Sequence, residues 1–239
     1  MHITKIRLLR DKFPTREHYP FSLGVFNTTE SLDFTKPVTF FVGENGTGKS
    51  TLLQAVARSC NIHIWKDEER TRYRYNKFED GLHSCLTIEW SGEKMPGAFF
   101  ASEFFRHFTE ILDEWAAADP GVLNSFGSES LRQKSHGQRH MAYFKNRFRI
   151  RGLYLLDEPE NALSPIKQLA LLDLLREMSS AGNVQFIIAS HSPILLAYPD
   201  ADLYSFDYSP IRKVRYEETD YYRIYRDFLN NRERYLGGQ

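Results

Sequence analysis

Short apolar runs alternate along the chain with segments whose apolar residues recur every three or four positions. The short runs predict buried strands, and the wider spacing predicts helices that cover them. The predicted strands are residues 3–9, 38–42, 62–65, 84–90, 98–101, 152–157, 184–189 and 203–206. The predicted helices are residues 52–57, 104–115, 165–180, 192–197 and 220–236, with another opening at Arg139. This alternation predicts an α/β fold with a mostly parallel sheet flanked by helices.

The middle of the chain, residues 61–134, departs from this regular alternation. It combines three short predicted strands with one amphipathic helix, for which Ser102 is well placed as the N-cap. A charged run of mixed sign at 66–77 is expected to face solvent. We therefore predict one domain over residues 1–239, into which a small mixed α/β lobe is inserted at about 61–134.

The composition excludes several classes of protein. The 239 residues carry 31 acidic and 31 basic side chains, so no overall field recruits nucleic acid or membrane. Cys60 and Cys85 are the two cysteines, and their spacing matches neither a disulfide framework nor a zinc site. No apolar run of about 18 residues occurs, and the first residues do not resemble a signal peptide. A cytoplasmic protein without direct membrane insertion is therefore expected.

A glycine-rich loop between a predicted strand and a predicted helix carries the strongest chemical signal. Its sequence fits the phosphate-loop pattern Gly-x-x-x-x-Gly-Lys-Ser, in the strand–loop–helix context that this pattern requires. The glycines let backbone N–H groups approach an anion, Lys49 can reach the β- and γ-phosphates, and Ser50 offers a hydroxyl to Mg²⁺. A glycine turn that binds nothing is the alternative, which the complete pattern disfavours. The loop therefore predicts a P-loop NTPase fold. The predicted nucleotide-binding residues are Gly43, Glu44, Asn45, Gly46, Thr47, Gly48, Lys49, Ser50 and Thr51.

Two carboxylates follow the predicted strand at 152–157. Asp157 is suited to hold Mg²⁺ opposite Ser50, because carboxylate and hydroxyl oxygens are ligands that this ion accepts. Glu158 is then placed to orient or deprotonate the attacking water. The alternative is an ordinary transition from strand to turn, and the phosphate loop earlier in the chain argues against it.

A histidine follows the predicted strand at 184–189. Ligands of open parallel sheets lie beyond the carboxyl ends of the strands, so His191 is expected at the same rim as Lys49 and Glu158. There it can hydrogen-bond a γ-phosphate oxygen and the catalytic water. The alternative is a structural or surface histidine.

The tetrapeptide Ser135-His136-Gly137-Gln138 precedes a predicted helix. A serine hydroxyl and a glycine N–H at a helix start form an end that can bind an anion. Ser135, Gly137 and Gln138 are therefore predicted to contribute to nucleotide binding, although the tetrapeptide alone would be a weak signal.

In order, these motifs resemble those of the ATP-binding-cassette (ABC) ATPase family. Residues 43–51 match its Walker A loop and 153–158 its Walker B strand. Residues 135–138 resemble the signature motif, 160–164 the D-loop, and His191 the switch histidine. The matching motifs span nearly the whole chain.

Two segments resemble one branch of this family in particular. They are Asp-Glu-Pro-Glu-Asn-Ala-Leu-Ser-Pro at 157–165 and Ala-Ser-His-Ser-Pro at 189–193. Both are most similar to the stand-alone branch of predicted AAA/ABC ATPases, which is related to DNA-repair, chromosome-maintenance and overcoming-lysogenization-defect ATPases.

The resemblance implies an ATPase that works as an ATP-dependent homodimer. Two subunits would pair head to tail, so that Ser135 and Gly137 of one touch the γ-phosphate bound by the other. Hydrolysis through Glu158 would open the pair. The signature departs from the family pattern Leu-Ser-Gly-Gly-Gln, because Lys134 replaces the leucine and His136 the first glycine.

The sequence leaves the output of this switch open between two classes. One is a soluble switch that acts on nucleic acid or an effector protein, and the other is the ATP-binding subunit of a membrane transporter. Family members usually carry a glutamine between Walker A and the signature, but this chain has none between Gln54 and Gln133, and Glu103 is the nearest substitute. That absence favours the first class.

Two further features keep alternatives open. The stretch 132–151 holds seven Lys or Arg and no Asp or Glu, so it either lines a groove for backbone phosphates or faces nucleotide and solvent. The aromatic residue that stacks on adenine, if one does, is not singled out. The candidates are Phe13, Tyr19, Phe21 and Phe26.

Overall fold

The computed structural model describes residues 1–65, 76–119, 121 and 136–237. The predicted surface run at 66–77 lies mostly outside these residues, as do Ser135 and residues 120 and 122–134 of the predicted lobe. Within the described part, no helix is long and apolar enough to cross a membrane.

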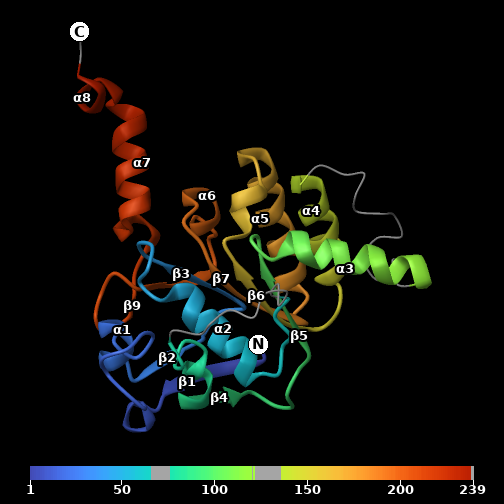
Figure 1. Ribbon diagram of the computed structural model, residues 1–239. Coiled ribbons are helices and arrows are strands. Elements are labelled where there is room, and N and C mark those ends of the chain that lie inside the picture. The colour runs from blue at the N-terminus through green and yellow to red at the C-terminus, as the bar shows by residue number, and fades with distance from the viewer. Residues whose placement is uncertain (66–75, 120, 122–135, 238–239) are drawn as a thin grey trace.

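A six-stranded sheet forms the centre of the fold, with strand order β5-β6-β7-β3-β8-β9 (Figure 1). Its first five strands are parallel, and β9 runs antiparallel to β8. The bounds are β3 Val38–Val42, β5 Gly97–Ala101, β6 Gly152–Asp157, β7 Val184–Ala189, β8 Ala201–Ser205 and β9 Arg212–Lys213. Every residue of β3, β6 and β7 is buried, as expected for strands covered on both faces.

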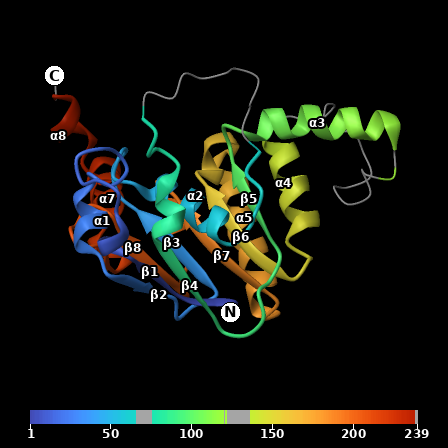
Figure 2. The same ribbon diagram turned by 60° about the horizontal axis from the view of Figure 1, so that its bottom comes forward.

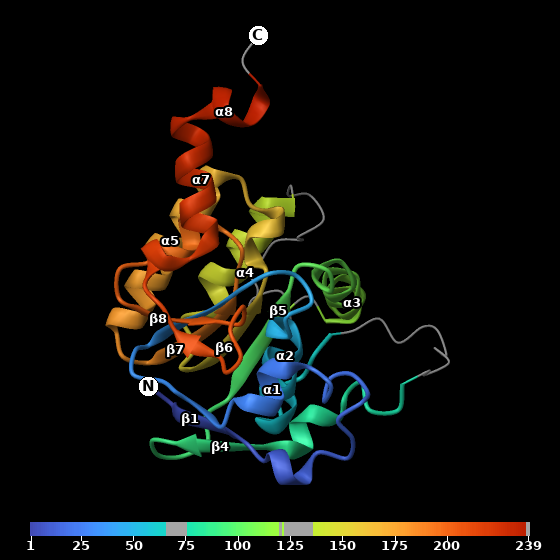
Figure 3. The ribbon, with the colours of Figure 1, turned by 90° about the vertical axis from the view of Figure 1, so that its left-hand side faces the viewer.

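A second, antiparallel sheet has the order β2-β1-β4, with β1 Ile3–Leu8, β2 Ser31–Asp33 and β4 Leu86–Trp90. Helix α2, Lys49–Ser59, lies between the two sheets (Figure 3). Leu52, Leu53 and Val56 of α2 belong to one buried cluster with Ile6 of β1 and Leu155 of β6. This cluster fixes the helix that follows the phosphate loop.

The opposite face of the main sheet is covered by α3 Phe105–Ala118, α4 His136–Arg147, α5 Pro165–Ser180 and α6 Pro193–Leu196. Figure 2 shows α3 crossing near one end of α4. Phe144 of α4 and Leu175 of α5 are fully buried beside Phe186 of β7. The described residues therefore form two cores, one on each face of the sheet.

The last helices leave the body of the molecule. Helices α7 Asp220–Asn230 and α8 Arg232–Leu236 contain no buried residue and project away from the sheets (Figure 1). The remaining short elements are α1 Gly24–Thr28 and 3₁₀ turns at Arg10–Lys12, Gly81–Cys85, Pro159–Ala162 and Tyr216–Glu218.

The predicted mostly parallel sheet is confirmed, and the strands predicted at 38–42, 152–157 and 184–189 have the observed bounds. The prediction of a strand at 62–65 is wrong, because these residues form no strand. Their apolar side chains serve packing instead: Ile62 is buried, and the Trp65 ring lies 5.4 Å from that of Phe108.

The prediction that Ser102 caps the following helix is also wrong. Helix α3 begins at Phe105, and the Ser102 hydroxyl instead donates to the Glu158 carbonyl at 2.8 Å. Within the predicted insertion, β4 pairs with β1 and β5 pairs with β6, so the two strands join the two different sheets. The lobe and its boundaries stay a prediction.

Candidate active site

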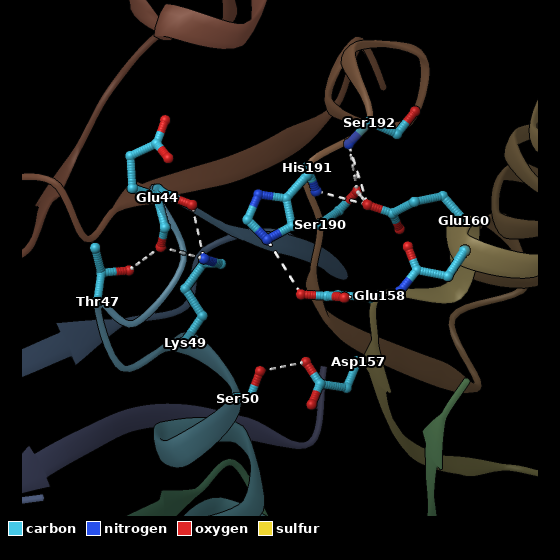
Figure 4. Close-up of polar contacts among 12 residues, drawn as sticks. Glu44, Thr47, Lys49, Ser50, Asp157, Glu158, Glu160, Ser190, His191 and Ser192 are labelled. Atoms are coloured by element: carbon cyan, nitrogen blue, oxygen red, sulfur yellow. Dashed lines mark hydrogen bonds and ion pairs between the residues drawn. The ribbon is translucent and has the colours of Figure 1, made fainter. Parts of the chain in front are cut away.

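The predicted functional residues of three strands meet at one rim of the main sheet. The phosphate loop follows β3, Asp157 ends β6 and Glu158 comes directly after it, and His191 follows β7 (Figure 4). Because these neighbouring strands are parallel, their carboxyl ends lie together. Residues far apart in the sequence therefore form one cluster.

The backbone of the phosphate loop depends on glycine at two positions. Gly46 has φ +79° and Gly48 has φ +104°, a region that other residues rarely adopt. A Cβ at Gly48 would lie 2.9 Å from the Phe26 ring, so both conformation and packing exclude a side chain there. Nothing lies within 4 Å of a Cβ built on Gly46, so this side of the loop is open.

Lys49 is buried beneath the loop and is held by the loop's own carbonyl groups. Its Nζ donates to Gly43 O at 2.6 Å and to Glu44 O at 2.8 Å. The Thr47 hydroxyl donates to Glu44 O at 2.8 Å, and Asp207 accepts from the Glu44 N–H at 2.8 Å. Burial lowers the pKa of Lys49, because the ammonium has exchanged water for carbonyl oxygens. An anion in the loop would supply the missing counter-charge.

Ser50 and Asp157 face each other across the cluster. The Ser50 hydroxyl donates to Asp157 Oδ1 at 2.8 Å (Figure 4). Burial raises the pKa of Asp157 to about 7, although the bond from Ser50 opposes this shift. Two hard oxygen donors, one of them a buried carboxyl without a full counter-charge, fit Mg²⁺. The described residues contain no group of three His, Cys, Asp or Glu arranged for a metal.

Glu158 adopts a backbone conformation that is rare for its residue type. Its φ is +47°, in the left-handed region, which costs about 1–2 kcal/mol for a residue with a Cβ. The main chain is held on both sides: the N–H donates to Ala189 O at 2.9 Å, and the carbonyl accepts from Ser102. The side chain accepts from Asn161 at 2.8 Å and lies 3.1 Å from His191 Nε2. Neighbouring strands thus hold the carboxylate in a fixed direction.

His191 is held in place by a buried carboxyl group. Glu160 Oε1 accepts from the His191 N–H at 2.6 Å, from the Ser190 hydroxyl at 2.8 Å and from the Ser192 N–H at 3.1 Å. Burial lowers the pKa of His191, and the nearby Lys49 charge lowers it further. The ring is therefore neutral at pH 7 and carries one N–H.

Several residues of this site were not predicted from the sequence. Tyr221 contacts His191 Nδ1, Ser102 and Glu160 hold the backbone of the rim, and Asp207 binds the phosphate loop. Asp207 follows β8 at the same rim, so its place after a parallel strand was a usable signal. The helical spacing of the tail gave no sign that Tyr221 returns to the site.

The predicted signature residues lie at the start of α4. A Cβ on Gly137 would lie 2.7 Å from Ala162 O and 2.8 Å from Lys167 Nζ, so the glycine permits close packing against the turn after β6. Gln138 is exposed, and Ser135 lies outside the described residues. The nearest neighbours of Gly137 thus belong to the D-loop segment and α5, not to the phosphate loop.

The four aromatic candidates for adenine stacking differ in exposure. Phe21 and Phe26 are fully buried, and the Phe13 ring packs 4.9 Å from that of Phe21. Tyr19 is 42% exposed, and its hydroxyl contacts that of Thr51 at the end of the phosphate loop. Of the four, Tyr19 alone combines an open ring with contact to the loop.

Comparison with known proteins gives family matches in two parts of the chain. A family described as "AAA domain" matches residues 22–78, and one described as "AAA domain, putative AbiEii toxin, Type IV TA system" matches residues 130–197. The thiamine import ATP-binding protein ThiQ of Ruegeria sp. strain TM1040 is 30% identical over 164 residues, which are 64% of this chain and 69% of that protein.

Solved structures show the same fold at lower sequence identity. An ATP-binding cassette of an ABC transporter in its ADP conformation has a TM-score of 0.55 at 16% identity and covers 99% of both chains. The SMC head domain from Thermotoga maritima has a TM-score of 0.52 at 16% identity and covers 90% of this chain and 100% of its own. With the phosphate loop, the carboxylates after β6 and His191 on one rim, this chain belongs to the ABC-type P-loop ATPases, enzymes that bind and hydrolyse ATP.

Proposed function

We propose that this ATPase is a cytoplasmic switch in which ATP closes a homodimer and hydrolysis opens it, in the service of a nucleic-acid or effector-protein partner. One observation carries the proposal. The phosphate loop, the carboxylates and His191 share one rim, whereas Gly137 packs against Ala162 and Lys167. An anion-binding helix start that does not serve its own phosphate loop is suited to serve the loop of a second copy.

ATP binding rests on the phosphate loop. Lys49 would exchange the carbonyl oxygens of Gly43 and Glu44 for the β- and γ-phosphates, and the loop N–H groups would face the same charge. The open side of Gly46 leaves room for this approach. Tyr19 would stack on the adenine, because its exposed ring adjoins the end of the loop.

Mg²⁺ would be held by Ser50 and Asp157. When bound, the ion offsets the charge of the phosphate oxygens and keeps the nucleotide oriented. The buried carboxyl of Asp157 would then have a cation beside it, which opposes the rise in pKa that burial causes.

Glu158 and His191 would act on the water and the terminal phosphate. The carboxylate would take the proton of the attacking water, while the histidine would donate from Nε2 to a γ-phosphate oxygen. The two side chains lie 3.1 Å apart, so they can serve the same reacting centre.

A soluble partner is supported by the basic stretch after the signature. Lys145, Arg149 and Arg151 are exposed, so they are free to meet the phosphates of a nucleic acid. The test is whether DNA or RNA stimulates ATP hydrolysis. A stimulation that is lost when these three residues are changed to Gln would identify nucleic acid as the partner. An effector protein is expected if nucleic acid has no effect.

The second candidate function is the ATP-binding subunit of a membrane transporter. The similarity to the thiamine import protein favours it. Glu103 argues against it, because it follows β5 beside the site, where the family usually has a glutamine that couples the site to its partner. Recovery of a membrane permease with the tagged protein would favour the transporter.

The dimer is tested by blocking hydrolysis. Glu158→Gln with ATP and Mg²⁺ should run as a dimer by light scattering and shift toward monomer with ADP, because closure requires the γ-phosphate. Adding Ser135→Arg should abolish the dimer and leave ATP binding intact. Ser180→Arg, at an exposed position near the end of α5, is the matched control and should leave the dimer unchanged. A dimer that ignores both nucleotide and Ser135→Arg contradicts the proposal.

A further inference from the structure

Tyr221 in the first turn of α7 joins the C-terminal helix to the ATPase rim. Its hydroxyl contacts His191 Nδ1 and also lies 3.2 Å from Gly43 O, to which it can donate. The two rings pack edge to face, with centroids 5.3 Å apart. One hydroxyl therefore touches both the histidine and the first residue of the phosphate loop.

The protons on the His191 ring decide what this contact does. A neutral imidazole carries one N–H, and Nε2 lies 3.1 Å from Glu158 Oε1, which accepts hydrogen bonds. Both ring contacts are satisfied when Nε2 carries the proton and Nδ1 accepts from the Tyr221 hydroxyl. With the proton on Nδ1, the tyrosine would have to turn its own proton to Gly43 O, and Nε2 would have nothing to donate. Glu158 thus favours the Nε2–H form, and the Tyr221 hydroxyl matches it by donating to Nδ1.

We propose that Tyr221 is a positioning residue for ATP hydrolysis: its hydroxyl donates to Nδ1 and holds the His191 ring so that the Nε2–H points toward Glu158 and the terminal phosphate. The effect on hydrolysis rests on the proposed role of His191, whereas the effect on the hydrogen bond to the ring does not. Partners that orient a functional histidine in this way are a general device in enzyme sites.

Tyr221 combines ring packing with the polar contacts of its hydroxyl, and the proposed role belongs to the hydroxyl. Helix α7 contains no fully buried residue, and the half-buried Tyr221 ring packs against the core on this face of the sheet. Burial beside the acidic groups Glu44 and Asp207 raises the pKa of Tyr221 to about 12. The hydroxyl therefore keeps its proton over the working pH range and remains a donor.

Tyr221→Phe removes the hydroxyl and keeps the ring packing. We expect kcat for ATP hydrolysis to fall about 10–100-fold, the usual loss when an orienting partner is removed, with KM for ATP changed less than about threefold. Tyr225→Phe is the matched control, since it makes the same change one turn further along α7 at an exposed position, and it should leave kcat unchanged. In a His191→Ala background, Tyr221→Phe should cause no further loss, because the hydroxyl acts through the histidine.

The tautomer is measured independently of activity. In ¹⁵N spectra of the nucleotide-free protein, His191 should show the Nε2–H form, and its Nδ1 resonance should move downfield in Tyr221→Phe because Nδ1 loses its hydrogen-bond donor. If the wild type proves not to hydrolyse ATP, the proposed function fails while these spectra still decide the role of Tyr221. Unchanged spectra overturn the proposal. So does a kcat loss of equal size with and without His191, because Tyr221 would then act through Gly43.

Discussion

The rim of the main sheet and helix α7 both supply side chains to the site, but they are held very differently. Strands β3, β6 and β7 are buried along their whole length, between two cores that both combine aliphatic and Phe side chains. Helix α7 has no buried residue, and Ile224 and Leu229 are 57% and 69% exposed.

The difference in burial means that the side chains at the rim are held in fixed positions, whereas the side chains of α7 can shift. Groups on buried parallel strands cannot move without disturbing two cores, so Asp157, Glu158 and His191 keep their spacing. Tyr221 belongs to an element with few buried contacts, the kind that opens at low free energy. The rim therefore fixes the chemistry, and the helix is the part whose displacement would change it.

The largest expected effect comes from the rim. Glu158→Gln should lower kcat at least about 100-fold, the scale of a general base, and leave ATP binding intact. Glu177→Gln on the exposed side of α5 makes the same change away from the site and should have no effect. Steady-state ATPase assays and ATP titrations measure both. If Glu158→Gln hydrolyses ATP at the wild-type rate, the general base is another residue. The rim would then not supply the chemistry that Tyr221 is expected to adjust.

The second effect tests the rigidity of the sheet. Phe186 is fully buried, with its ring 4.8 Å from that of Phe148 and 5.6 Å from that of Tyr154. Phe186→Ala should lower the free energy of unfolding by about 3–5 kcal/mol, because it leaves a cavity between sheet and helices. Urea denaturation followed by circular dichroism measures this value. A loss below about 1 kcal/mol would show that this core is not tightly packed.

Much of the rim could be predicted from the sequence because its signals are local. Strand periodicity, the glycine loop and the position of Asp157 at a strand end are all readable within a few residues. Parallel pairing then places strand ends together. The strand wrongly predicted at 62–65 marks the limit of this reasoning, because apolar side chains that pack on a core resemble those of a short strand.

The contacts that complete the site could not be predicted, because they join distant segments. Tyr221 reaches His191 across 30 residues, and Ser102 reaches the carbonyl of Glu158 across 56. Ser102 also satisfied the local rule for a helix cap, but the tertiary bond to Glu158 prevailed. Local preference predicts elements, whereas such bonds depend on the finished fold.

The third effect is a dependence of stability on pH at Asp157. Its folded pKa is raised to about 7, so the folded chain keeps a proton that the unfolded chain releases near pH 4. Stability from this group is therefore present at low pH and lost as pH rises from about 4 to 7. Asp157→Asn stays neutral at every pH. Its advantage over the wild type in free energy of unfolding should therefore grow by about 2 kcal/mol from pH 5 to pH 8, measured without metal or nucleotide.

Thermal unfolding at a series of pH values measures this gain. Asp173→Asn, at an exposed position on α5, is the control and should behave like the wild type throughout. If the stability difference between Asp157→Asn and the wild type is the same at pH 5 and pH 8, the pKa of Asp157 is not raised in the folded chain. Burial would then not shield this carboxyl from solvent.

The smallest effect belongs to α7. Leu229→Ala should change the free energy of unfolding by less than about 0.5 kcal/mol, because the side chain is already exposed and alanine suits a helix at least as well. Leu171→Ala on α5 makes the same substitution at a fully buried position and should cost about 2–5 kcal/mol. Urea midpoints for the two variants measure the contrast directly. A loss above about 1 kcal/mol at Leu229, growing with protein concentration, would mean that a second copy covers α7 in solution. The helix would then be held as firmly as the sheet, and the hydroxyl of Tyr221 would no longer be the adjustable contact of the site.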